Sequence, residues 1–80
     1  MSDQRIQVFA YSGYRGEEIP RAMIIRDVRI DVVKILNMLI EEGVEDRGRK
    51  RFFEFEGHDR KNYRIYYLEK AGEWYHKVED

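Results

Sequence analysis

The chain has 80 residues, a length that allows one domain whose single core barely offsets the entropy of the chain. It contains no cysteine, which excludes a disulfide framework and a zinc site held by thiolates. Its 15 basic and 16 acidic residues nearly cancel, leaving a formal net charge of -1. A generally basic, phosphate-seeking protein is therefore disfavoured, although a local basic patch is not.

The sequence has no apolar run long enough to cross a bilayer. The run from Met38 to Ile40 is preceded by Lys34 and Asn37, and the opening residues MSDQRIQ lack the apolar segment of a signal peptide. With 42% hydrophobic and 14% aromatic residues, the composition is typical of a folded chain. We therefore expect a folded cytoplasmic protein without a membrane partner.

The first part of the chain predicts three strands. Alternation over Arg5–Tyr11 indicates the first strand. Pro20 holds Ile19 in an extended conformation, which favours a second strand over residues 21–26. Arg26 and Asp27 lie between two β-rich runs and predict a tight hairpin, because Asp tolerates the left-handed conformation of such turns. The third strand then begins, with these residues expected to face inward: Val28, Ile30 and Val32.

Residues 31–43 predict the only helix. Asp31 is a plausible N-cap, and Gly43 is placed to end the helix. Apolar residues recur at helical spacing and form one stripe, with a methionine as gap-filler: Val32, Ile35, Leu36, Leu39, Ile40 and Met38. We expect this stripe to pack against the sheet.

Three further strands are predicted over residues 51–57, 62–69 and 73–79, with turns at 57–61 and 70–73. The expected fold is α+β in one domain, residues 1–80. It combines an antiparallel sheet of five to six strands, open or partly closed into a barrel, with one amphipathic helix in the order βββαβββ.

Strand parity divides the last three strands into two faces. The more apolar set is assigned to the core: Phe53, Phe55, Tyr63, Ile65, Tyr67, Trp74 and Val78. The other face mixes aromatic and charged residues: Lys50, Phe52, Glu54, Arg64, Tyr66, Leu68, Tyr75 and Lys77. A one-residue bulge would exchange the two sets.

Sheet-based modules stack single-stranded bases on exposed aromatic rings, each stack being worth roughly 1–3 kcal/mol. The candidate binding residues are three anchors, two charge partners and a basic extension: Phe52, Tyr66 and Tyr75; Arg64 and Lys77; and Arg49, Lys50 and Arg51. Against this interpretation, glutamates at positions 54, 56 and 79 would repel phosphates, and the four acids of the preceding EEGVED run could neutralise the basic extension.

Two alternatives to nucleic-acid binding stay open for this face. Its side chains could form ordinary cross-strand pairs, each worth about 0.2–1 kcal/mol. They could also anchor a protein–protein or homo-oligomerisation surface without any nucleic-acid binding, which would depend only mildly on salt.

No catalytic constellation, cofactor motif or metal motif is found. His58 and His76 are the only histidines and lack the spacing of metal ligands, while Ser2 and Ser12 are the only serines and there is no threonine. His76 is interpreted as a partly buried core histidine. If the protein were an enzyme, His76 and Glu54 would be the pair to test.

Four segments together resemble a small bacterial domain family of unknown function: RGEEIPRAMIIRDVRIDVVKIL, RFFEFEG, YRIYYLE and GEWYHKVED. In that family an arginine-rich approach leads to a hairpin with the pattern aromatic-x-Gly-x-x-aromatic-x-Val, followed by a short helix and a closing Gly-x-Trp strand. Asp27 stands here in place of the turn glycine, and Ile25 and Ile30 in place of aromatics. Because some relatives resemble segments attached to lesion-bypass polymerases, the resemblance implies a role in nucleic-acid transactions but no catalytic residue.

Overall fold

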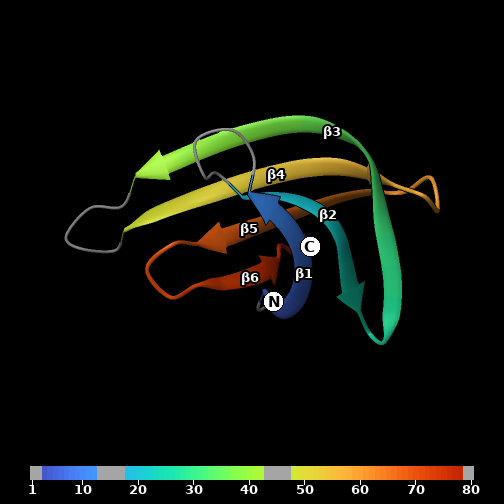
Figure 1. The fold of residues 1–80 in the computed structure, drawn as a ribbon, viewed down its shortest axis with the longest axis horizontal. Helices are drawn as coiled ribbons and strands as arrows, with labels where there is room; N and C mark the ends of the chain where they lie inside the picture. The colour runs from blue at the N-terminus through green and yellow to red at the C-terminus, as the bar shows by residue number, and fades with distance from the viewer. Residues whose placement is uncertain (1–2, 13–17, 43–47, 79–80) are drawn as a thin grey trace.

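The computed structural model describes residues 3–12, 18–42 and 48–78, and their regular secondary structure is entirely β-strand. The six strands are β1 (Gln4–Ser12), β2 (Glu18–Ile25), β3 (Val28–Glu42), β4 (Arg49–Gly57), β5 (Asn62–Leu68) and β6 (Glu73–His76). Each strand pairs antiparallel with the next one in the chain, and β1 pairs with β6 to close a barrel (Figure 1). No helix capable of crossing a membrane occurs in these described ranges.

The predicted α+β class is therefore wrong. The expected third strand and residues 31–42 of the expected helix form one long strand, β3, so the predicted order βββαβββ is replaced by six successive strands. Asp31, the predicted N-cap, is a strand residue paired with Ala22. Gly43, the predicted end of the helix, lies outside the described residues.

Two β-bulges in β3 explain why its sequence resembles a helix. The pairing with β4 passes from Val32 to Lys34 and from Ile35 to Asn37, so one residue is left without a partner in β4 at each bulge. Each extra residue lengthens the interval between inward positions from two residues to three. Val32 and Ile35 consequently both pack against the core at a spacing that also suits a helical stripe.

The rest of the predicted stripe does not reach the core. Leu36, Leu39 and Ile40 are 42%, 58% and 45% exposed. Leu36 forms the second bulge, and Leu39 and Ile40 follow it. In this part of the strand β3 pairs with β4 and no longer with β2. Burial of the whole stripe was therefore a wrong prediction, because it required a helix lying on the sheet.

The hairpin between β2 and β3 is confirmed. Ile25 pairs with Val28, and both turn residues between them have positive φ, 51° at Arg26 and 64° at Asp27. This conformation suits a two-residue hairpin, because its twist matches that of the flanking strands. Val28, expected to face inward, is 54% exposed because it lies at the tip of this hairpin.

The core lies inside the barrel, and four residues predicted from strand parity are in it: Phe53, Phe55, Ile65 and Trp74. Met23 and Ile30 join them from β2 and β3. Trp74 contacts two aromatic rings, with centroid distances of 5.6 Å to Phe53 and 4.7 Å to Tyr67. Val78, assigned to the core, lies beyond the end of β6 and is half-buried. Regular alternation in β4, β5 and β6 therefore allowed most of the core residues to be predicted.

The strand β3 changes its pairing partner at Asp31. It pairs with β2 from Val28 to Asp31 and with β4 from Val32 onward, and Figure 1 shows it running beside β2 before turning to follow β4. His58, in the turn after β4, holds this point. The ring Nδ1 of His58 accepts a hydrogen bond from the backbone N–H of Asp31 at 2.9 Å. The backbone N–H of His58 donates to the carbonyl of Asp31, also at 2.9 Å.

The turn that carries His58 is tightly packed. A Cβ added to Gly57 would lie 2.6 Å from Cγ2 of Ile30 and 2.8 Å from Oδ1 of Asp59. The Tyr63 hydroxyl donates a hydrogen bond to Oδ2 of Asp59 at 2.5 Å. Glycine at position 57 is therefore required for the turn to approach the hairpin of β2 and β3.

We predict that Gly57→Ala lowers the free energy of unfolding by about 1–3 kcal/mol, because overpacking must displace Ile30 or the Asp59 carboxylate. Urea unfolding followed by tryptophan fluorescence measures this. The control is Lys61→Ala in the same turn, whose side chain is exposed and whose loss should stay within about 0.5 kcal/mol. Equal stability of Gly57→Ala and wild type would contradict the packing described here.

Alkaline pH provides a second test of this turn. Burial, and then the hydrogen bond to Asp59, raises the pKa of the Tyr63 hydroxyl from 10.0 to about 12. The folded state therefore keeps a proton that the unfolded state loses, so this stabilisation is complete below about pH 10 and is lost as the pH approaches about 12. We predict that the stability difference between wild type and Tyr63→Phe shrinks over this window in urea titrations. A constant difference would show that the Tyr63 pKa is not raised.

Candidate binding surface

The outer face of β4, β5 and β6 carries a row of three aromatic rings. Phe52 pairs in register with Tyr66, and Tyr66 with Tyr75. Both neighbouring pairs have centroids 5.4 Å apart, with interplanar angles of 41° for Phe52 and Tyr66 and 17° for Tyr66 and Tyr75. The structure thus brings together the three predicted anchors, and we call them the aromatic ladder.

The two tyrosine hydroxyls of the ladder are engaged with carboxylates. The Tyr66 hydroxyl donates to Oδ2 of Asp3 at 2.6 Å, and the Tyr75 hydroxyl donates to Oε1 of Glu73 at 2.9 Å. Oδ1 of Asp3 also accepts a hydrogen bond from the N–H of Val78 at 3.2 Å. The ladder therefore helps to hold the segment before β1 against the segment after β6.

These contacts shift the acidities of the groups involved. The hydrogen bond from Tyr66 is the main cause that lowers the pKa of Asp3. Burial, and then the same hydrogen bond, raises the pKa of Tyr66. Both hydroxyls consequently stay protonated at neutral pH and act as donors.

Two lysines flank the ladder. The Nζ atom of Lys50 lies 5.7 Å from the centroid of the Tyr66 ring, and that of Lys77 lies 5.6 Å from the centroid of the Phe52 ring. Cation–π contacts at exposed sites are worth about 0.5–1 kcal/mol, so either ammonium can leave its ring at small cost. Positive charge is thus available beside the aromatic rings.

The predicted arginines of this surface contact carboxylates. Arg51 Nε lies 2.5 Å from Oε2 of Glu69, and Arg49 Nε lies 4.0 Å from the same oxygen. Arg64 Nε lies 3.8 Å from Oε2 of Glu54. Glu69, in the turn after β5, thus meets two residues of the basic extension. Of the four acids predicted to neutralise the extension, Glu41 and Glu42 pair in register with Lys50 and Arg49, and those at positions 45 and 46 lie outside the described residues. These pairs reduce the positive charge that the arginines offer to a ligand.

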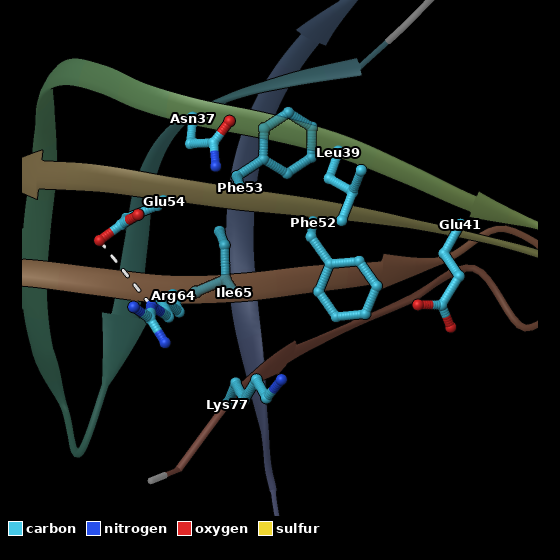
Figure 2. A pocket seen from close by; sticks show the side chains of 9 residues that line it. All are labelled: Asn37, Leu39, Glu41, Phe52, Phe53, Glu54, Arg64, Ile65 and Lys77. Atoms are coloured by element: carbon cyan, nitrogen blue, oxygen red, sulfur yellow. Dashed lines mark ion pairs between the residues drawn. The ribbon is translucent and has the colours of Figure 1, made fainter.

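A groove of about 240 Å³ crosses the outer face beside the ladder. Phe52 and Leu39 provide apolar surface, while the ion pair of Glu54 and Arg64 lies to one side (Figure 2). The complete lining is Asn37, Leu39, Glu41, Phe52, Phe53, Glu54, Arg64, Ile65 and Lys77. Three of the predicted binding residues, Phe52, Arg64 and Lys77, therefore line one groove.

Sequence reasoning missed the contribution of β3 to this groove. Asn37, Leu39 and Glu41 all come from the segment that was predicted to be helical. The three positions share one face of a strand, but residues 37–41, Asn-Met-Leu-Ile-Glu, do not alternate between polar and apolar side chains. The helical spacing of the preceding residues therefore concealed the contribution of β3.

His76 and Glu54 line a second hollow, of about 390 Å³, together with Asn62, Arg64, Lys77 and Val78. His76 is half-buried, as predicted, with its ring centroid 6.0 Å from that of Tyr63. Burial is the main cause that lowers its pKa, so the imidazole is neutral at pH 7. Within the described residues no three acidic or histidine side chains gather as metal ligands would.

Comparison of the chain with protein-family models, with curated proteins and with solved structures found no match. The resemblance to the bacterial domain family therefore stays a prediction based on the quoted segments.

We predict that Tyr66→Phe raises the pKa of Asp3 toward 3.8, because the largest cause of its depression is removed. NMR titration of the Asp3 carboxyl measures this shift. Tyr75→Phe is the matched control, since its hydroxyl donates to Glu73 and should leave Asp3 unchanged. A lowered folded-state pKa contributes stability that is lost as the pH falls below the usual Asp range, so Tyr66→Phe should also flatten the acid limb of the stability profile. An unchanged Asp3 pKa would show that the hydrogen bond does not form.

Proposed function

We propose that the protein is a small non-enzymatic binding module that holds single-stranded nucleic acid on the outer face of β4, β5 and β6. The supporting observation is the aromatic ladder with a lysine over two of its three rings. Bases stack on aromatic side chains without sequence preference, and ammonium groups accept the neighbouring phosphates. The proposal places the protein in the cytoplasm, in keeping with a chain that lacks cysteine.

Phe52 is the ring that we assign to base stacking. Tyr66 and Tyr75 are nearly parallel and stack on each other, so each ring covers one face of its neighbour. Phe52 is tilted by 41° from Tyr66 and borders the groove, where Leu39 adds apolar surface (Figure 2). An incoming base would replace the Lys77 ammonium over the Phe52 ring and leave it to pair with a phosphate.

The charges around the ladder limit the electrostatic part of binding. Arg51 and Arg64 lie against Glu69 and Glu54, while Lys50 and Lys77 lie over aromatic rings. If two lysines meet two phosphates of a single strand, the logarithm of the binding constant should fall with the logarithm of salt concentration with a slope of about −1.4. This is a much weaker salt dependence than that of a basic groove.

A protein–protein or homo-oligomerisation role for the same face is the alternative. It uses the apolar part of the groove, formed by Leu39 and Phe52, as the anchor site. It differs in that the surface would bind no oligonucleotide at any salt concentration.

Fluorescence anisotropy of labelled single-stranded and duplex oligonucleotides tests the proposal. We predict micromolar binding that prefers single strands and shows the shallow salt slope given above. Phe52→Ala should weaken binding about tenfold or more, in line with the loss of one base stack. The double change of Lys50 and Lys77 to Ala should bring the slope close to zero.

Lys61→Ala removes a lysine from the turn that holds His58, away from the ladder, and serves as the charge control. It should leave both affinity and slope unchanged. Absence of binding at low salt would refute the nucleic-acid proposal, and equal loss in Lys61→Ala and the double variant would show that the charge acts without a defined site.

A further inference from the structure

The later half of β3 has one edge with which no described strand pairs. Its pairing with β2 ends at Asp31, and from Val32 onward the described strands pair with it only through β4. Figure 1 shows β3 and β4 running side by side past the start of β2. The backbone groups on the other side of this segment are thus available to another strand.

This segment also exposes apolar side chains. Val33, Leu36 and Leu39 are 63%, 42% and 58% exposed, and Met38 and Ile40 are 51% and 45% exposed. Strands at sheet edges are usually protected by proline, by charges or by short length. The strand β3 has 15 residues and no proline, and Lys34 is its only charged residue between Val32 and Ile40.

We propose that this edge pairs antiparallel with the same edge of a second copy of the chain, forming a two-fold symmetric dimer. The charges of β3 favour this occupant. Lys34 and Glu41 lie at opposite ends of the exposed segment. A two-fold axis through Met38, with Leu36 left without a partner as it is against β4, sets Lys34 of each copy opposite Glu41 of the other. A parallel arrangement would instead place like charges together.

The dimer goes beyond the proposed function and does not depend on it, because it uses the edge of β3 rather than the ladder. Pairing would join the outer faces of the two barrels into one surface. Asn37, Leu39 and Glu41 line the groove and belong to the paired segment, so the two grooves would lie on either side of the joint.

Charge reversal with sedimentation velocity tests the proposal. Wild type should show a reversible monomer–dimer equilibrium, and Lys34→Glu or Glu41→Lys alone should weaken the dimer by about tenfold, because two attractive pairs become repulsive. The double variant, Lys34→Glu with Glu41→Lys, should recover the wild-type dimer. Within one chain these positions are seven residues apart, roughly 23 Å along a strand, so recovery requires contact between copies.

A single introduced cysteine gives a second readout that survives poor folding of a charge variant. The chain has no cysteine of its own, so Met38→Cys, at the proposed axis, should form a disulfide-linked dimer on mild oxidation. Arg29→Cys is the matched control, since Arg29 is exposed on β3 where the strand pairs with β2, and it should stay monomeric.

A monomer at all concentrations would overturn the proposal. So would a dimer that neither charge reversal weakens, or equal crosslinking through positions 38 and 29. Oligonucleotide binding by a strictly monomeric protein would leave the proposed function intact while removing the dimer, so the two failures are distinguishable.

Discussion

The structure depends on how β3 changes its pairing partner at Asp31. Before this residue the strand completes a hairpin with β2, and after it the strand pairs with β4. The backbone and the Nδ1 atom of His58 hold Asp31 from both its N–H and its carbonyl, and Gly57 lets the turn approach closely enough to do so. Because one strand pairs with two neighbours in succession, a chain of this length closes a barrel, and the remainder of β3 has one edge with which no described strand pairs.

The same strand shapes the outer surface. Its second bulge precedes Asn37 and sets the alternation that brings Leu39 beside Phe52, which places apolar surface from β3 next to the aromatic ladder of β4 to β6. The ladder, in turn, connects the two ends of the described chain through the hydrogen bonds of Asp3 to Tyr66 and Val78. The aromatic ladder therefore belongs to the binding face and also helps to close the barrel. The lysines add the charge on which nucleic-acid binding would depend.

Regular alternation was readable from the sequence, and departures from it were not. The two-residue hairpin was predicted from Arg26 and Asp27, and the core residues Phe53, Phe55, Ile65 and Trp74 from parity, because no bulge interrupts β4, β5 or β6. In β3 the bulges at Val33 and Leu36 give a strand the spacing of a helix, and no local residue type marks them. The arrangement of Phe52, Tyr66 and Tyr75 followed from parity, whereas Leu39 and its neighbours could be placed on that face only once β3 was known to be a strand.

The central claim is that residues 31–42 form a bulged strand that leaves β2 for β4. Two-dimensional nuclear Overhauser spectra test it most directly. We predict cross-strand contacts between the backbones of Ile35 and Phe55 and of Met38 and Phe53, together with a contact between Asp31 and the His58 ring. Strong sequential amide contacts and Hα contacts three residues apart through this segment would indicate a helix and contradict the account.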